Sequence, residues 1–271
     1  IADLTVDGSL CTGAAVCTML LLAGHSPWIA MLCAVLAGLL AGTVTGLLHA
    51  LLGIPPILAG ILTQMVLWSV NLKILGKANQ ALPARSIDVL LTQMNIPAAL
   101  PVLLGWAAVL VTLLVLFFST ELGCALRATG CNPVMSRAQG VNTGLMKVIG
   151  LALSNAVVAM SGGLLCQYQG YTDVNMGRGA VVIGLAAVVI GQAVLGRHGG
   201  HMAAQLGGVV LGAVIYYIVY QVIIFAGFDT DLLKMFSAVV VAVFLGVPHV
   251  RDQIRTNSRI KKGGSRHAEN A

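Results

Sequence analysis

The feature that most constrains this chain is a long stretch without charge: Gly8 to Leu72 contains no Asp, Glu, Lys or Arg over 65 residues. A helix needs about 20 apolar residues to cross the hydrocarbon core of a bilayer, so this stretch is long enough for three crossings. Soluble domains carry about 25% charged residues, whereas this chain has 9% and is 58% hydrophobic. The composition excludes a water-soluble globule and a disordered chain, and it predicts an integral membrane protein.

Pro and Gly clusters divide the apolar stretches into about eight predicted spans. They cover approximately residues 8–23, 28–52, 56–74, 98–118, 148–168, 179–195, 202–225 and 233–248. Backbone groups in lipid must be hydrogen-bonded internally, and these runs do not alternate as barrel strands would. We expect an all-α, polytopic transmembrane helical bundle over residues 1–250, followed by a basic tail over 251–271. The chain starts without Met, and a further helix is expected upstream of it.

The distribution of Lys and Arg predicts the orientation of the chain in the membrane. A cytoplasmic C-terminus places segments 119–147 and 196–201 and the tail inside, with ten of the 15 basic residues. Arg178 then lies at the outer boundary. The net charge of +6 would favour nucleic-acid binding in a soluble protein, but here it sets orientation, so the lipid bilayer and not a nucleic acid is the expected partner.

Small residues form two patterns. Gly38, Gly42 and Gly46 lie four residues apart, which on a helix makes a smooth stripe that lets another backbone approach closely. The stripe predicts either packing within one subunit or a seam between subunits that lines a translocation path. The six cysteines show no CxxC pairing, and we expect small buried side chains rather than disulfides or metal ligands.

The segment 119–147 is too polar to cross a membrane. Asn132 can cap a helix whose first turn holds Pro133, and Gly130 and Gly140 are expected to punctuate its two ends. This pattern predicts a short amphipathic helix on the cytoplasmic side. Such a helix either lies on the lipid headgroups or docks a cytoplasmic protein.

Charged side chains are absent from the centres of the predicted spans, which argues against a proton relay or a charged ion pore. Neutral polar residues remain. Gln64, Trp68 and Asn71 recur near one face of the third span (i, i+4, i+7), and Asn155 lies in the fifth. They serve either as hydrogen bonds between helices or as a weakly polar path for a solute.

Two short motifs flank predicted spans. Asp7-Gly8-Ser9 is typical of a helix start, with Asp7 or Ser9 as the cap of the first span; Asp3 and Asp7 are alternatively placed to meet a cytoplasmic partner. Gly177-Arg178-Gly179 is predicted to be a turn on the outer side. No GxxxxGK[ST] motif is present, so any ATP that drives this chain is expected to bind a partner.

The run ALRATGCNPVMSRAQGVN, followed by LSNAVVAMSGGLLCQYQGYTDVNMGRGAVVIGLAAVVIG, resembles permease subunits of bacterial ABC importers that serve branched-chain amino acids, ribose and related solutes. The opening IADLTVDGS and the QYQGY run are most similar to the branch assigned to tryptophan or tyrosine uptake. The resemblance covers the chain from Ile1 to about Val250.

The resemblance implies a bacterial inner-membrane subunit that is not an enzyme and holds no cofactor or metal. It implies three partners: a cytoplasmic ABC ATPase, a second permease copy and an extracytoplasmic solute-binding protein. The coupling segment is carried onto about 123–145, and its candidate ATPase-coupling residues are Arg127, Gly130, Asn132, Pro133, Arg137 and Gly140. From the residues alone, a secondary carrier or a channel for a small neutral or zwitterionic solute remains the alternative.

Overall fold

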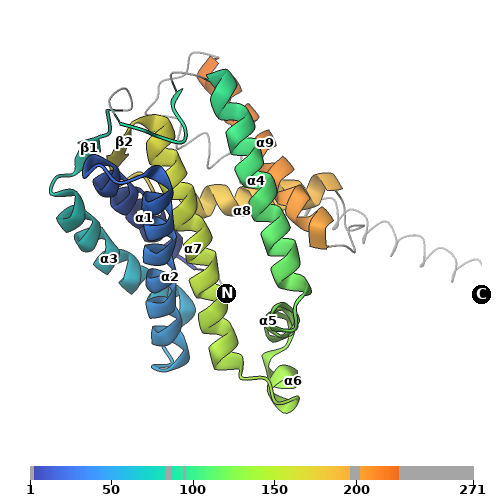
Figure 1. Ribbon diagram of the computed structural model, residues 1–271. Helices are drawn as coiled ribbons and strands as arrows, with labels where there is room; N and C mark the ends of the chain where they lie inside the picture. Colours follow the sequence, from blue (N-terminus) through green and yellow to red (C-terminus); the bar gives the residue numbers. More distant parts are fainter. Residues whose placement is uncertain (1–2, 84–86, 94–95, 196–201, 226–271) are drawn as a thin grey trace, which may run out of the picture. The chain divides into compact units, whose positions relative to one another are not determined.

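The computed structural model describes residues 3–83, 87–93, 96–195 and 202–225. In chain order the elements are α1 Thr5–Leu22, α2 Pro27–Ala50, α3 Pro56–Leu75, β1 Asn79–Ala81, α4 Ile96–Ser119, α5 Glu121–Cys131, α6 Pro133–Ala138, α7 Thr143–Gln169, β2 Tyr171–Asp173, α8 Ala180–Leu195 and α9 Met202–Phe225 (Figure 1). In this part of the chain, six helices are long and apolar enough to cross a membrane, namely α1 to α4, α7 and α9, and α8 is a shorter apolar helix. Each predicted span up to 202–225 coincides with one of these helices; the predicted span 233–248 and the tail 251–271 lie outside the described residues.

The chain forms two compact units, residues 1–181 and 182–271. In the first unit α1 is the central helix and packs against α2, α3 and α7, while α2 and α7 pack against each other along their length (Figure 1). Much of α1 is made of small or hydroxyl residues rather than large apolar ones. Small side chains allow this close packing, and hydroxyl groups bind across it.

Three buried hydrogen bonds join α1 to its neighbours. The hydroxyl of Thr5 pairs with that of Thr45 at 2.9 Å, and the hydroxyl of Thr18 pairs with that of Thr172 at 2.6 Å. Ser9 donates to Oδ1 of Asn155 at 2.6 Å. Since buried polar groups are costly when unpaired, these bonds specify how α1 is placed as well as stabilising it.

The glycine stripe of α2 packs within the subunit. A Cβ atom at Gly38 or Gly42 would overlap the backbone of α7 at Asn155 and Leu151, and one at Gly46 would lie 2.8 Å from the Cα atom of Val148. The packing interpretation of this stripe is therefore confirmed. The second unit also has a close helix contact at a glycine, because a Cβ at Gly212 of α9 would overlap the Ala187 carbonyl of α8.

A two-stranded antiparallel ribbon, absent from the predicted all-α fold, joins β1 to β2. Asn79 pairs with Asp173, and Ala81 pairs with Tyr171. The ribbon follows the C-terminal ends of α3 and α7, so it ties together two helices that are distant in the chain (Figure 1). It satisfies backbone groups that two separate loops would leave to solvent.

All six cysteines are free thiols, but only half fit the predicted buried state. Cys11, Cys17 and Cys166 are buried, and Cys33 is partly buried. The prediction is wrong for Cys124 and Cys131, which are exposed. Both belong to α5, a helix outside the apolar spans whose buried positions are Gly123 and Thr129.

Candidate functional site

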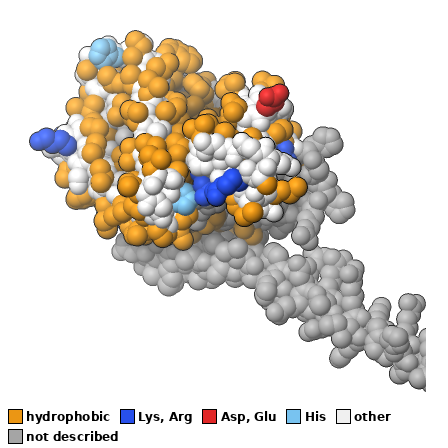
Figure 2. Space-filling model, turned by 90° about the horizontal axis from the view of Figure 1, so that it is seen from below, with side chains coloured by type: hydrophobic (Ala, Val, Ile, Leu, Met, Phe, Trp, Pro, Cys, Tyr) orange, Lys and Arg blue, Asp and Glu red, His pale blue; other side chains and the backbone are white. Residues whose placement is uncertain are grey.

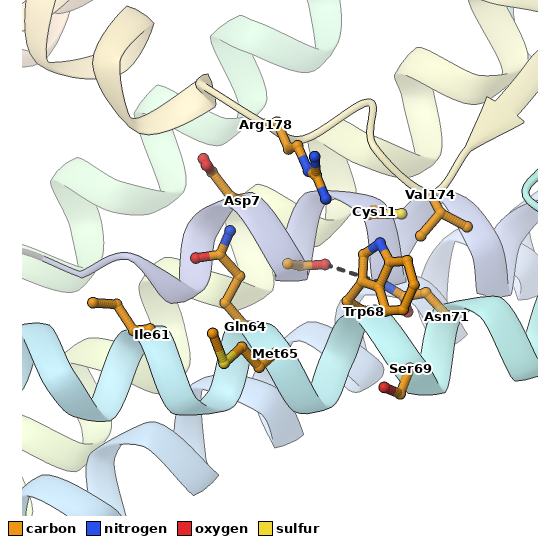
Figure 3. A pocket seen from close by; sticks show the side chains of 11 residues that line it. Asp7, Cys11, Ile61, Gln64, Met65, Trp68, Ser69, Asn71, Val174 and Arg178 are labelled. Atoms are coloured by element: carbon orange, nitrogen blue, oxygen red, sulfur yellow. Dashed lines mark hydrogen bonds between the residues drawn. The ribbon is translucent and has the colours of Figure 1, made fainter.

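A cleft of about 590 Å³ opens in the first unit between α1, α3 and the segment 174–179 (Figure 3). It is lined by Asp7, Gly8, Cys11, Ile61, Gln64, Met65, Trp68, Ser69, Asn71, Val174 and Arg178. The three residues of α3 predicted to share a face, Gln64, Trp68 and Asn71, all belong to this lining. Ligand sites have volumes of roughly 300–1,000 Å³, so the cleft is large enough for a small solute.

The far wall of the cleft is a non-helical segment that runs back along α1. At one end Thr172 bonds Thr18; further along, the Cys11 thiol donates to the carbonyl of Asp173 at 3.4 Å. At the other end the carboxylate of Asp7 accepts from the backbone N–H of Gly179. From Thr18 to Asp7 this path follows α1 for about 16 Å at 1.5 Å per residue.

Two glycines let this segment lie flat on α1. A Cβ at Gly177 would overlap the carbonyl of Asp7, and Gly179 has a φ of +92°, which side-chain-bearing residues rarely adopt. The predicted turn at 177–179 is therefore present. The structure adds that Arg178 shares the cleft with Gln64 and Trp68 of the central turns of α3, a neighbourhood that the prediction of an outer position did not include.

The role predicted for Asp7 and Ser9 as caps of α1 is also corrected. The N-cap of α1 is Leu4 without a side-chain hydrogen bond, and Asp3 accepts from the Thr5 N–H at 2.9 Å. Asp7 instead accepts from the N–H groups of Gly179 and Val181, each at 3.1 Å, and so caps the start of α8. A carboxylate at a helix N-terminus is favoured by the helix dipole.

Two charged residues, Asp7 and Arg178, therefore line the cleft beside the middle of α3, although the centres of the spans themselves carry no charged residue. The Arg178 side chain is exposed, and within the part of the chain that the structure describes no acceptor pairs with its guanidinium group. Figure 3 shows it reaching from the 174–179 segment towards α3, with Trp68 and Gln64 opposite. Uncharged span centres therefore do not by themselves exclude a proton-coupled carrier.

Asn71 belongs to the cleft lining and carries an unsatisfied buried acceptor. It is 1% exposed, and its Nδ2 donates to the carbonyl of Gly8 at 3.4 Å. Its Oδ1 is buried and has no hydrogen-bond partner. Native structures leave few such atoms unpaired, and a bound ligand is one way to satisfy them.

Asn155, the fourth predicted path residue, lies elsewhere. It is fully buried in the core and is not part of the cleft lining. It accepts from Ser9 at 2.6 Å and donates to the carboxylate of Asp3 at 2.7 Å and to the carbonyl of Leu151 at 2.9 Å. Its amide is fully used in holding α1 against α7.

The polar insertion contains two helices, α5 and α6, where one was predicted. Asn132 ends α5 and caps α6, and its Oδ1 accepts from the N–H groups of Val134 and Met135, each at 3.1 Å. Pro133 occupies the first helical turn, so the predicted cap and start of α6 are confirmed. Helix α5 escaped prediction because it has only two large apolar residues, Leu122 and Leu126, and most of its other apolar residues are small.

The other predicted coupling residues fall on both helices. Arg137 donates to the hydroxyl of Thr143 in α7 at 3.1 Å, and Gly140, with a φ of +84°, ends the α6 turn as predicted. Gly130 lies inside α5, so its predicted role as a helix boundary is wrong. Arg127 is exposed on α5.

Helix α6 exposes apolar side chains at one end of the first unit. Val134 is 79% exposed and Met135 59% exposed. Behind them a second cleft of about 520 Å³ includes Gly130, Pro133 and Lys147 in its lining. The view from below in Figure 2 shows a largely hydrophobic surface at this end, with small groups of Lys, Arg and His side chains and few acidic ones.

The described residues contain no group of three or more His, Cys, Asp or Glu that could hold a metal ion. The fold and the two sites define a class: a multi-pass helical membrane protein with a largely apolar cleft that carries a few polar side chains, and with an exposed helical element outside the spans. This is the construction expected of a solute permease.

The family comparison makes that class specific. The family model described as the branched-chain amino acid transport system / permease component matches residues 1–248. The chain belongs to this family, and it is a membrane permease subunit of an ABC importer in the bacterial membrane. No solved structure matches the chain.

Relatives whose names state a transport function agree with this membership. A tyrosine transport system permease protein of Clostridioides difficile is 35% identical over 260 residues, which is 95% of this chain and 86% of the relative. The autoinducer 2 import system permease protein LsrC of Escherichia coli is 31% identical over 199 residues, 70% of this chain and 55% of the relative. An uncharacterised protein of Rickettsia prowazekii is 28% identical over 90% of this chain and 87% of its own length.

Proposed function

We propose that this chain moves an aromatic amino acid inward by alternating access, driven by a separate ABC ATPase that docks on α5 and α6. The solute follows the name of the tyrosine transport relative. Two copies of the permease pair in the inner membrane, and an extracytoplasmic binding protein delivers the solute. In this arrangement the C-terminus and the segment 123–145 face the cytoplasm.

The observation that carries the proposal is the construction of α6. Val134 and Met135 project apolar side chains away from the unit, which offers a partner surface to bury. The helix itself is held by the Asn132 cap at one end and by the bond from Arg137 to Thr143 of α7 at the other. A displacement of α6 is therefore passed to α7, which packs along α1 and α2.

The solute path runs by Gln64, Trp68 and Asn71. Coupling requires that the ATPase and the solute each bind the inward-open and the outward-open forms of the permease with different free energies. The cleft borders α1 and α3, and α1 also packs on α7, so the same packed helices connect the proposed path to α6. Nothing in this mechanism requires the chain to form or break a covalent bond.

The test is to reconstitute the permease with its ATPase and binding protein and to measure solute uptake and ATP hydrolysis. Replacing residues 131–139 by a Gly/Ser linker is expected to abolish uptake and co-purification of the ATPase. The finer variant Val134→Ser/Met135→Ser is expected to lower uptake at least tenfold.

The matched control is Leu51→Ser/Leu52→Ser, because these side chains are an equally exposed apolar pair in the turn after α2 and lie outside α5 and α6. It is expected to leave uptake near that of the unchanged chain. Uptake that persists without ATP and collapses with an ion gradient would replace the proposal by a secondary carrier, and passive flux would replace it by a channel.

A further inference from the structure

We propose that the cleft between α1, α3 and the segment 174–179 is a binding site for a zwitterionic α-amino acid, with Arg178 holding the carboxylate. The inference rests on the proposed function and names the chemistry of the solute at the same path. It adds two charged residues, Arg178 and Asp7, to the neutral residues of α3.

The anionic half of the ligand follows from Arg178. A charged side chain beside the centre of a span is costly and is found paired or facing a polar cavity. Non-helical backbone at that depth is tolerated where it is buried in protein or lines a cavity, which describes 174–179. Since Arg178 has no acceptor among the described residues, and a guanidinium fork matches a carboxylate with two parallel bonds, an anionic oxygen pair is the fitting partner.

The cationic half follows from Asp7 in the same lining. Each carboxylate oxygen of Asp7 accepts one backbone N–H, which leaves further lone pairs for another donor. An ammonium group supplies three donors and the positive charge that complements this carboxylate, which a neutral or anionic group does not.

The remaining wall selects the side chain of the solute. Trp68 is 44% exposed and lines the cleft opposite Arg178 (Figure 3). An indole face binds aromatic and apolar groups through a large contact area. Met65 and Ile61 extend this apolar wall along α3, so an amino acid with an aromatic or large apolar side chain fits better than a sugar.

Binding is tested by introducing one cysteine and measuring whether the ligand protects it from a thiol reagent. The sample is the full chain in nanodiscs, and Cys124→Ser and Cys131→Ser remove the exposed native thiols. Met65→Cys places the probe in the cleft, and Val66→Cys, an exposed neighbour outside the lining, is the matched control. A water-soluble maleimide is expected to label Met65→Cys at least fivefold more slowly with saturating L-tyrosine, and to label Val66→Cys at an unchanged rate.

Analogues and variants of Arg178 identify the contact. Hydroxyphenylpropionate, which keeps the carboxylate, is expected to protect weakly, and tyramine, which lacks it, not at all. Arg178→Gln is expected to abolish protection by L-tyrosine and Arg178→Lys to retain part of it, whereas Lys73→Gln, which removes an exposed cation of α3 outside the cleft, is expected to leave protection intact.

No labelling of Met65→Cys, equal labelling with and without L-tyrosine, or protection that survives Arg178→Gln would each overturn the assignment. A different result would contradict the proposed function, namely solute uptake that does not require the ATPase. A reconstituted transporter whose ATPase-driven uptake is unchanged by Arg178→Gln would thus reject this site while leaving the importer intact.

Discussion

The cleft beside α3 takes its polar side chains from three segments that are far apart in the chain, whereas the α5–α6 pair is one continuous run from Thr120 to Gly140. Arg178 reaches α3 only because β2 and the segment after it fold back along α1. Helix α6 is defined by its immediate neighbours, the cap at Asn132 and the turn at Gly140. The cleft therefore depends on tertiary packing, and the helix pair depends on local bonds.

The largest expected effect is the loss of that tertiary packing. Gly162→Val places a side chain into the backbone of α1 at Leu10, and overpacking of this kind costs up to about 3 kcal/mol. The midpoint of thermal unfolding in detergent is expected to fall steeply, and L-tyrosine protection in the cleft to disappear with it. Gly105→Ala on α4, where a Cβ meets nothing within 4 Å, is the control, and an equal loss of stability there would contradict the comparison.

A smaller effect is expected where α1 holds the backbone of residues 179–181. Asp7→Ala removes the acceptor of two backbone N–H groups, which is expected to cost about 2 kcal/mol. Asp7→Asn keeps one acceptor oxygen without the charge, so it is expected to recover part of the stability while binding of L-tyrosine stays weak. Equal stability of the Ala variant and the unchanged chain in the same unfolding assay would remove Asp7 from this role.

The local region is probed by Asn132→Ala, which leaves two N–H groups of α6 without their acceptor. The expected cost is about 1 kcal/mol, confined to α6. Hydrogen exchange is expected to rise at Val134 and Met135 and ATP-driven uptake to fall, while L-tyrosine protection in the cleft is unchanged. Asn132→Ser retains a capping oxygen and is expected to restore uptake; a loss of protection in the cleft would show that the two regions are not independent.

The smallest expected effect is at the contact between α6 and α7. Arg137→Gln and Thr143→Val each break one hydrogen bond of 3.1 Å, which is worth about 1 kcal/mol or less. Because the two changes remove the same bond, the double variant is expected to be no worse than either single one in stimulated ATP hydrolysis. Additive losses would mean that Arg137 acts on the partner and not on α7.

The contrast also explains what the sequence allowed us to predict. Charge-free apolar runs mark the spans because a bilayer imposes a length on each helix, and the spacing of Gln64, Trp68 and Asn71 was enough to place them on one face of α3. Asn132 and Pro133 predicted the start of α6 because caps and first-turn prolines act locally.

Long-range packing was beyond such reasoning. Arg178 lies at the end of a polar run in the chain, and only the return of 174–179 along α1 brings it beside α3. Asn155 has the same residue type as Asn71, yet it is fully paired in the core, because its neighbours come from α1. The β1–β2 ribbon depends on two three-residue segments separated by four helices and carries no local signal.

The shared use of Asn132 has a mechanical consequence. Asn132 is both the C-cap of α5 and the N-cap of α6, so the two helices are joined through one residue without an intervening loop. In the proposed coupling, a loop of several residues would absorb a displacement by rearranging its dihedrals, whereas this direct junction passes the displacement from one helix to the other. Length changes are tolerated in most surface connections, but one residue inserted at this junction is expected to weaken the proposed coupling.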